Sequence, residues 1–193
     1  MATSVVEICN AALSLIGEKQ ITNATLSSDT EAERQCSLIY PIIKDRLLRA
    51  HPWNFAESRT QLASLTATPD FEFTYYYKLP SNCIRALRLY GTDENFRVES
   101  GGKLATDASP CKLIYTAKIE DVSTFDSGFT YALIYALAAH LAVVLSANKG
   151  LSDQLKVEAE RHLKEARQQD GQEGTPYNLR HSNAWNTFRN RRP

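Results

Sequence analysis

The side chains most able to do chemistry, the histidines, are scattered through the sequence. His51, His140, His162 and His181 lie in four different segments, and none stands in a metal-binding motif such as H-E-x-x-H. His140 lies in an apolar stretch with no nucleophile nearby in the sequence, so we interpret it as a core histidine, or one that hydrogen-bonds a neighbouring helix, and not as a general base. The histidines therefore predict no catalytic centre.

One histidine has carboxylates at helical spacing. His162 has Glu158 and Glu165 about one turn away on either side. Three such groups could start a metal site, but the same spacing is typical of an exposed, salt-bridged helix face. We favour the salt-bridged face.

Short motifs that hold phosphate or activate a nucleophile are missing from the sequence. It contains no G-x-S-x-G, no G-x-x-x-x-G-K-[ST] and no G-x-G-x-x-G. Ser100-Gly101-Gly102-Lys103 joins two predicted strands and opens no helix, so it predicts a hairpin turn. We therefore predict no catalytic residues, no cofactor and no metal. The alternative is a small cytosolic enzyme whose scattered His and Asp side chains converge in a pocket.

The cysteines form no recognised pair. Cys9, Cys36, Cys83 and Cys111 are widely spaced, without a C-x-x-C motif, and the N-terminus lacks the features of a signal peptide. Cys9 and Cys36 fall on the apolar faces of predicted helices, where a free thiol behaves as a small hydrophobe. We expect structural thiols in a chain made in a reducing cytosol.

Residues suited to binding gather at the C-terminal end, where aromatic side chains alternate with arginines and asparagines. Trp, Tyr and Arg dominate the energetics of protein interfaces, and a segment rich in them can become ordered on a partner. A contact with nucleic acid and a disordered end are the alternatives. The residues predicted to make the contact are Tyr177, Arg180, Trp185, Phe188, Arg189, Arg191 and Arg192.

Charge is balanced over the whole chain but not along it. The 193 residues carry 22 basic and 22 acidic side chains, so the composition gives no sign of a nucleic-acid binder. Residues 174–193 contain four arginines and no acid, which leaves the rest of the chain with a net charge of −4. This size predicts one domain, or one domain with an arm.

Two amphipathic runs predict two N-terminal helices. Residues 4–16 form the first, ended by Gly17, and residues 29–50 form the second, after an N-cap region at Ser28-Asp29-Thr30-Glu31. Pro41 lies inside the second run and predicts a kink, with two shorter helices as the alternative. Pro52 ends this helix, because a proline favours an extended conformation in the residue before it.

The hydrophobic period then changes from 3.6 to 2. Trp53 and Phe55 start the first strand with their rings on one face. The run 71–79 places aromatic rings on both faces of a strand, so that one face either meets another subunit or forms a rim around the core. The predicted strands, in an antiparallel arrangement, are 54–64, 71–78, 83–90, 96–99 and 111–118.

Two further helices follow the strands. Asp126-Ser127 opens a third helix that is apolar almost all round over 129–145; a buried helix is favoured over a membrane span because the apolar run is short and contains His140. Ser152-Asp153 caps a fourth helix, 152–169, which forms a hairpin with the third.

The expected fold class is α+β. Two N-terminal and two C-terminal helices, from residues 1–52 and 119–169, form a four-helix bundle. Residues 53–118 form an inserted antiparallel β-rich region, and residues 170–193 a flexible joint with an extended C-terminal arm.

Four motifs in this order resemble the head-to-tail adaptor family of short-tailed bacteriophages, also called tail tubular protein A. They cover nearly the whole chain and come together with the closing helical hairpin. The motifs are Ile8-Cys9-Asn10-Ala11-Ala12-Leu13 with Ile16-Gly17-Glu18, then Glu31-Ala32-Glu33-Arg34-Gln35-Cys36, then Leu48-Arg49-Ala50-His51-Pro52-Trp53-Asn54-Phe55-Ala56, then Tyr77-Lys78-Leu79-Pro80.

The resemblance implies a non-enzymatic virion protein at the head–tail junction, made in the bacterial host cytoplasm. Such a protein forms a homo-oligomeric ring, usually of twelve subunits, between the portal protein and the tail nozzle or hub protein. DNA passes through the bore as non-specific cargo, and no membrane is involved. By position, residues 177–193 would contact the portal. A near-neutral body suits this role, since each cation that neutralises a phosphate would slow passage.

A DNA-binding regulator is the third interpretation. It requires a basic groove outside the C-terminal segment.

Overall fold

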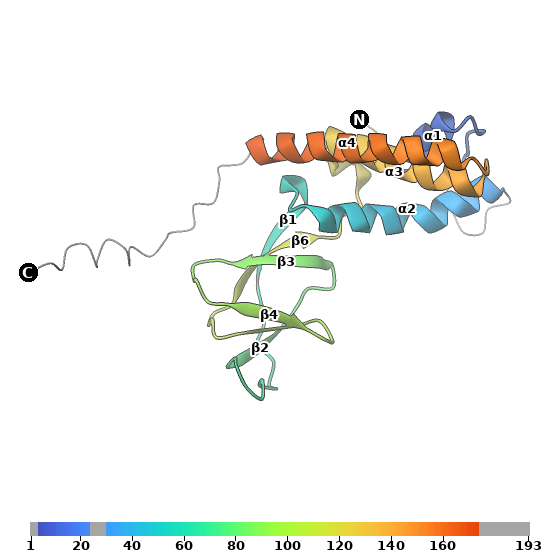
Figure 1. The fold of residues 1–193 in the computed structure, drawn as a ribbon. Coiled ribbons are helices and arrows are strands. Elements are labelled where there is room, and N and C mark those ends of the chain that lie inside the picture. The colour runs from blue at the N-terminus through green and yellow to red at the C-terminus, as the bar shows by residue number, and fades with distance from the viewer. Residues whose placement is uncertain (1–3, 24–29, 174–193) are drawn as a thin grey trace, which may run out of the picture.

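The computed structural model describes residues 4–23 and 30–173. Within these ranges the chain has an α+β fold with four helices and two small antiparallel sheets, which confirms the expected fold class at that level (Figure 1). The helices are α1 (Val5–Leu15), α2 (Glu31–Ala50), α3 (Ser127–Val144) and α4 (Lys149–Glu173). The strands, all between α2 and α3, are β1 (Glu57–Gln61), β2 (Tyr75–Lys78), β3 (Cys83–Leu89), β4 (Phe96–Glu99), β5 (Lys103–Thr106) and β6 (Lys112–Ala117).

Side-chain caps start the two N-terminal helices. The Ser4 hydroxyl accepts from the backbone N–H of Glu7 and begins α1, and the Thr30 hydroxyl accepts from that of Glu33 and begins α2. Gly17, at φ 75°, ends α1 as its position predicted. Helix α2 runs through Pro41 without interruption, so the alternative of two shorter helices is wrong.

The His51-Pro52-Trp53 junction turns more sharply than its sequence predicted. Residues Asn54–Ala56 form a 3-10 turn and β1 begins only at Glu57, so the prediction of a strand starting at Trp53 is wrong. The Trp53 and Phe55 rings still share one side, because both contact Phe129 at ring-centre distances of 5.2 and 5.1 Å. The Trp53 indole donates to the carbonyl of Leu47 at 2.9 Å, which satisfies a carbonyl in the last turn of α2.

The strands form two three-stranded sheets, in the orders β1-β6-β3 and β2-β5-β4. Tyr77, Leu104 and Leu113 belong to the small core that the two sheets share. The predicted strand 71–78 is half as long as expected, since only Tyr75–Lys78 pairs, and β5 was not predicted. β5 shows no alternation because three of its four residues are buried. The hairpin turn predicted at Ser100–Lys103 is confirmed by the β4–β5 pairing.

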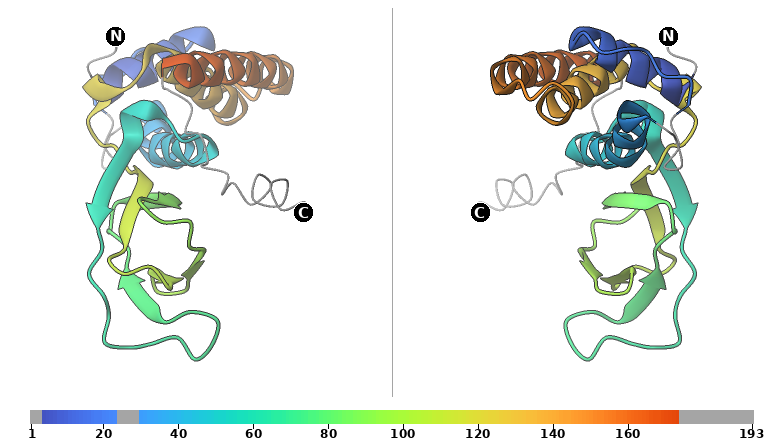
Figure 2. Two further views of the ribbon diagram at one scale, coloured as in Figure 1. Left: turned by 90° about the vertical axis from the view of Figure 1, so that its left-hand side faces the viewer. Right: turned by 90° about the vertical axis from the view of Figure 1, so that its right-hand side faces the viewer.

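Helix α3 contacts all three other helices, which are arranged around it in the views of Figure 2. Its closest neighbour is α4. A side chain on Gly128 would place its Cβ 2.9 Å from the Ala166 Cβ, so glycine allows the two helices to touch. The Ser152 hydroxyl donates to the Ala139 carbonyl at 2.7 Å inside this contact. Ser152 is therefore not the predicted cap; α4 begins three residues earlier, at Lys149.

Helix α4 also continues into the predicted joint. It is described as far as Glu173, so residues 170–173 are helical; the rest of the predicted joint and arm, 174–193, lies outside the described residues. Asp170 is only 7% exposed. Its carboxylate contacts His51 Nε2 at 2.9 Å and accepts from the backbone N–H of Asn54 at 2.9 Å, and its carbonyl accepts from the Asn54 side-chain amide. The end of α4 is thus fixed to the point where the chain leaves the helices.

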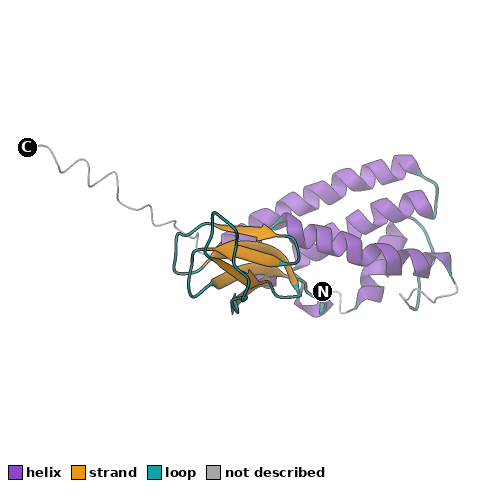
Figure 3. Cartoon of the chain, turned by 90° about the horizontal axis from the view of Figure 1, so that it is seen from below, coloured by secondary structure: helices purple, strands orange, loops and turns teal. Residues whose placement is uncertain are grey.

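This arrangement places the strands beneath one end of the helices (Figure 3). The contact of α2 with β3 joins the two parts of the fold, and Arg49 donates to the Ile84 carbonyl there.

The Asp170 contacts predict a specific loss of stability. Asp170→Ala removes two acceptor atoms from part-buried hydrogen bonds, so the free energy of unfolding is expected to fall by about 1–3 kcal/mol, measured by urea denaturation. Asp153→Ala, on the exposed side of the same helix, is the matched control and should leave the midpoint nearly unchanged. Equal midpoints for the two variants would contradict the structural role of Asp170.

Candidate functional site

The residues predicted to contact the portal all lie in 174–193, outside the described residues. Their role therefore stays a prediction. The candidate sites described below come from the helices and strands that the structure does describe.

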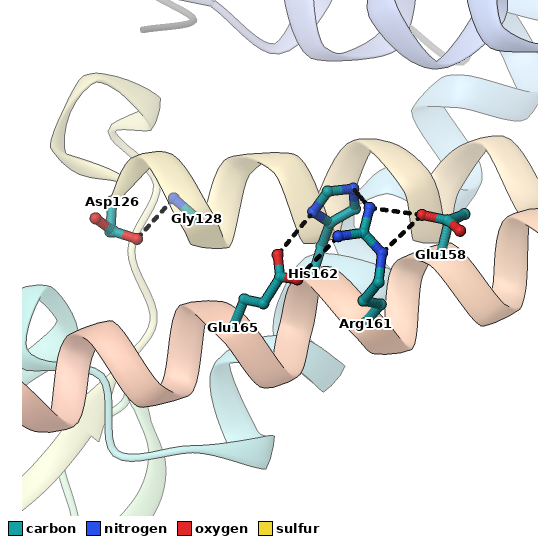
Figure 4. Close-up of polar contacts among 6 residues, drawn as sticks. All are labelled: Asp126, Gly128, Glu158, Arg161, His162 and Glu165. Atoms are coloured by element: carbon teal, nitrogen blue, oxygen red, sulfur yellow. Dashed lines mark hydrogen bonds and ion pairs between the residues drawn. The ribbon is translucent and has the colours of Figure 1, made fainter.

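The His162 region is a salt-bridged helix face, as favoured from the sequence. Arg161 donates to Glu158 at 2.7 Å and to Glu165 at 2.8 Å, so its guanidinium group lies between the two carboxylates (Figure 4). The His162 ring lies against Tyr135 of α3, with ring centres 4.7 Å apart. In the same view, the Asp126 carboxylate accepts from the backbone N–H of Gly128 and caps α3, as predicted.

The other histidines in the described residues, His51 and His140, do not converge. His51 pairs with Asp170, and His181 lies outside the described residues. The interpretation of His140 as a core histidine is wrong, since its side chain is exposed and lines a groove between α2 and α4. Within residues 4–23 and 30–173, no group of three or more His, Cys, Asp or Glu side chains is placed to hold a metal ion.

The thiols are arranged for packing. Cys9, Cys36 and Cys111 are fully buried, and all four cysteines are unpaired by disulfides. A hydrogen bond to Cys36 and burial raise the pKa of the Cys9 thiol, and burial raises that of Cys111 to about 11. Burial likewise raises the pKa of Cys83. Because the thiolate is the reactive form, Cys9, Cys83 and Cys111 are poor nucleophiles at neutral pH.

Helix α3 is the one helix among the described residues that is long and apolar enough to cross a membrane, with a mean hydropathy of 1.6. Half of this stretch is buried inside the fold, where α3 packs against the other helices. The core helix of a globular fold meets the same criterion, and this packing agrees with the predicted buried helix.

A first groove of about 400 Å³ lies between α2 and α4; we call it the alanine groove. Its floor is formed by Ala132, Ala136 and Ala139 of α3, and its walls include Ile43 and Leu163. Arg46, Lys156 and Glu160 form a charged rim, and His140 lies at its side. Ile42 and Val157, on the helices that border it, are 60% and 65% exposed. Small floor residues with apolar neighbours suit a protruding side chain better than a polar substrate.

A second groove of about 390 Å³ lies between α1 and α3; we call it the tyrosine groove. Ala11 and Leu15 of α1 line one side, and Tyr131, Ile134 and Tyr135 of α3 line the other. The Tyr131 side chain protrudes, at 57% exposed.

The two grooves use different sides of the same helix. At about 100° of rotation per residue, the α3 residues of the alanine groove and of the tyrosine groove are centred roughly 150° apart around the helix axis. The chain therefore presents two unlike apolar surfaces that face in different directions. Sequence periodicity could not separate them, because α3 is apolar almost all round.

A scan against protein-family models found no matching family, and a search of curated proteins found no match. The resemblance to head-to-tail adaptors therefore rests on the sequence motifs alone.

Thiol labelling tests the packing role of the cysteines. Ellman's reagent is expected to react slowly with the native chain, and first at the half-buried Cys83, while four thiols react at once in denaturant. A Gln154→Cys variant on the exposed side of α4 should label rapidly when native and serves as the control. Rapid labelling of Cys9 or Cys111 in the native chain would contradict this account.

Proposed function

We propose that the chain is a structural subunit of the connector ring at the head–tail junction of a short-tailed bacteriophage. Twelve copies, made in the host cytoplasm, join the portal protein to the tail nozzle or hub protein around a bore that passes DNA. The four helices form a bundle that carries the β-rich insertion, and residues 177–193 reach the portal as an arm. The chain is not an enzyme in this proposal.

The observation that carries the proposal is the pair of unlike grooves on α3. When a surface of one copy binds a different surface of the next, the contact is heterologous, and repetition gives a ring if the rotation closes. A two-fold dimer would instead need one surface that is complementary to itself. Two distinct apolar surfaces in different directions support head-to-tail addition of copies.

Exposed apolar side chains support the same conclusion. Leu15 and Tyr131, which are 37% and 57% exposed, both line the tyrosine groove. Isolated apolar residues on a surface are ordinary, but apolar groups collected along grooves mark interaction sites.

The two surfaces also differ in shape in a way that suits this pairing. Tyr131 protrudes from the tyrosine groove, whereas the floor of the alanine groove is made of small side chains. The Tyr131 ring of one copy would therefore fill the alanine groove of the next.

Cysteine cross-linking tests which surfaces meet. A mixture of Tyr131→Cys and Ala136→Cys chains, incubated with portal rings under mild oxidation, is expected to give a disulfide-linked dimer, because each mixed contact brings one of each thiol together. Each variant alone should give none. Cross-links within Tyr131→Cys alone would indicate a two-fold contact, and no cross-link in the mixture would contradict the head-to-tail arrangement.

A second experiment tests the arm. The double substitution Trp185→Ala and Phe188→Ala in the full chain is expected to weaken capture by immobilised portal rings at least tenfold, since aromatic anchors dominate interface energetics. Phe71→Ala, which removes a ring that is 79% exposed in the β-rich region, is the matched control. Undiminished capture of the double variant would remove the portal-contact role of 177–193.

A further inference from the structure

One face of the sheet β1-β6-β3 collects positive charge. Cross-strand pairing aligns Arg59 of β1 with Ile114 of β6 and Arg88 of β3 in one row. In the neighbouring rows Lys112 pairs with Gln61, and Arg85 pairs with Thr116. Directly paired residues point to the same side of a sheet, so these cations share one face.

The opposite face of this sheet is the one that packs against the second sheet. Leu113, Tyr115 and Ala117 alternate with the residues of the charged face and belong to the shared core. The charged face therefore points away from the second sheet. Within the paired rows of the three strands it carries four cations and a single acid, Glu57, which pairs with Arg59 at 2.9 Å.

A groove of about 320 Å³ lies at the end of the sheet where Gln61 pairs with Lys112, and Thr60 and Leu113 also line it. Arg59, Lys112 and Gln61 line it, Ile114 forms an apolar floor, and the Tyr90 ring stands at one end, 59% exposed. The Arg59 side chain is 71% exposed despite its ion pair with Glu57, so it is able to reach a ligand. We name these five residues the basic groove.

From this combination we propose that the basic groove binds a single strand of nucleic acid. Arg59 and Lys112 contact phosphates, Tyr90 stacks on a base, and the Gln61 amide donates to base or sugar oxygens. Proteins that bind single strands combine a cationic groove with exposed aromatic rings in this way. An exposed ring beside the cations favours a strand with free bases over a duplex, whose bases are already stacked. The inference goes beyond the proposed connector role and does not depend on it.

The test uses fluorescence anisotropy with the full chain and a fluorescein-labelled oligothymidine. The Arg59→Glu/Lys112→Glu variant is expected to bind about tenfold more weakly at low salt, and to reduce the slope of log affinity against log salt by about 1.4, as for two lost phosphate contacts on a single strand. Tyr90→Ala should weaken binding by about tenfold without changing this slope.

The matched control is Lys149→Glu/Lys164→Glu, which makes the same change in net charge on α4, away from the sheet. Because the basic C-terminal segment is present in every variant, only a loss specific to the basic groove supports the proposal. Equal affinities for the two double variants would overturn it. A preference for duplex DNA that depends on Arg59 and Lys112 would also overturn it, and would favour the DNA-binding regulator. Both results concern the basic groove only, so the connector proposal is still tested separately by cross-linking at the α3 grooves.

Discussion

The fold depends on a buried carboxylate that fixes the point where the chain leaves the helices for the strands. Asp170, near the end of α4, accepts from the backbone of Asn54 and contacts His51, where the chain leaves α2 for the strands. A second buried side chain, Lys44 of α2, fixes the segment that leads from the last strand back to the helices. Its ammonium donates to the Ile119 carbonyl and to the Glu120 carboxylate, both before α3 begins. The exit and the return of the β-rich insertion are therefore both fixed to helices. A charged group buried in this way is stable only with such partners.

The proposed assembly surfaces follow from the small residues of α3. Gly128 brings α4 into direct contact, and the alanines along the rest of the helix fill little space between α2 and α4. Helices joined by small residues pack closely at the contact and leave open grooves where they diverge. The same composition that makes α3 a core helix therefore supplies the floor of the alanine groove.

Local sequence patterns predicted the elements well where periodicity and caps agreed. The bounds of α1 and β4, the single helix α2 and the Asp126 cap all followed from nearby residues. The failures have a common cause, since each depends on contacts between distant residues. Asp170-Gly171 has the composition of a joint, yet its helix is held by residues more than one hundred positions away. His140 lies on an apolar helix but faces a groove that only the placement of α2 and α4 creates.

The candidate sites were harder to foresee than the fold. The pairing of β1 and β3 with β6 places Arg59, Arg88 and Lys112 on one face of the sheet. No short sequence motif predicts this pairing, because the three residues lie in separate strands. The residues that the sequence did single out, Tyr177 to Arg192, lie outside the described ranges. The sequence predicted only the C-terminal arm as a contact region. The structure adds the alanine groove and the tyrosine groove as candidate contact surfaces of the proposed connector.

The central claim is that copies of this chain add head to tail onto a ring-shaped partner. The most direct measurement is the mass of the complex formed when the chain is added to isolated portal rings, determined by native mass spectrometry. The account predicts one added subunit for each portal subunit, closing as a complete second ring. Portal rings whose mass stays unchanged, or that gain only two-fold dimers of the chain, would contradict it.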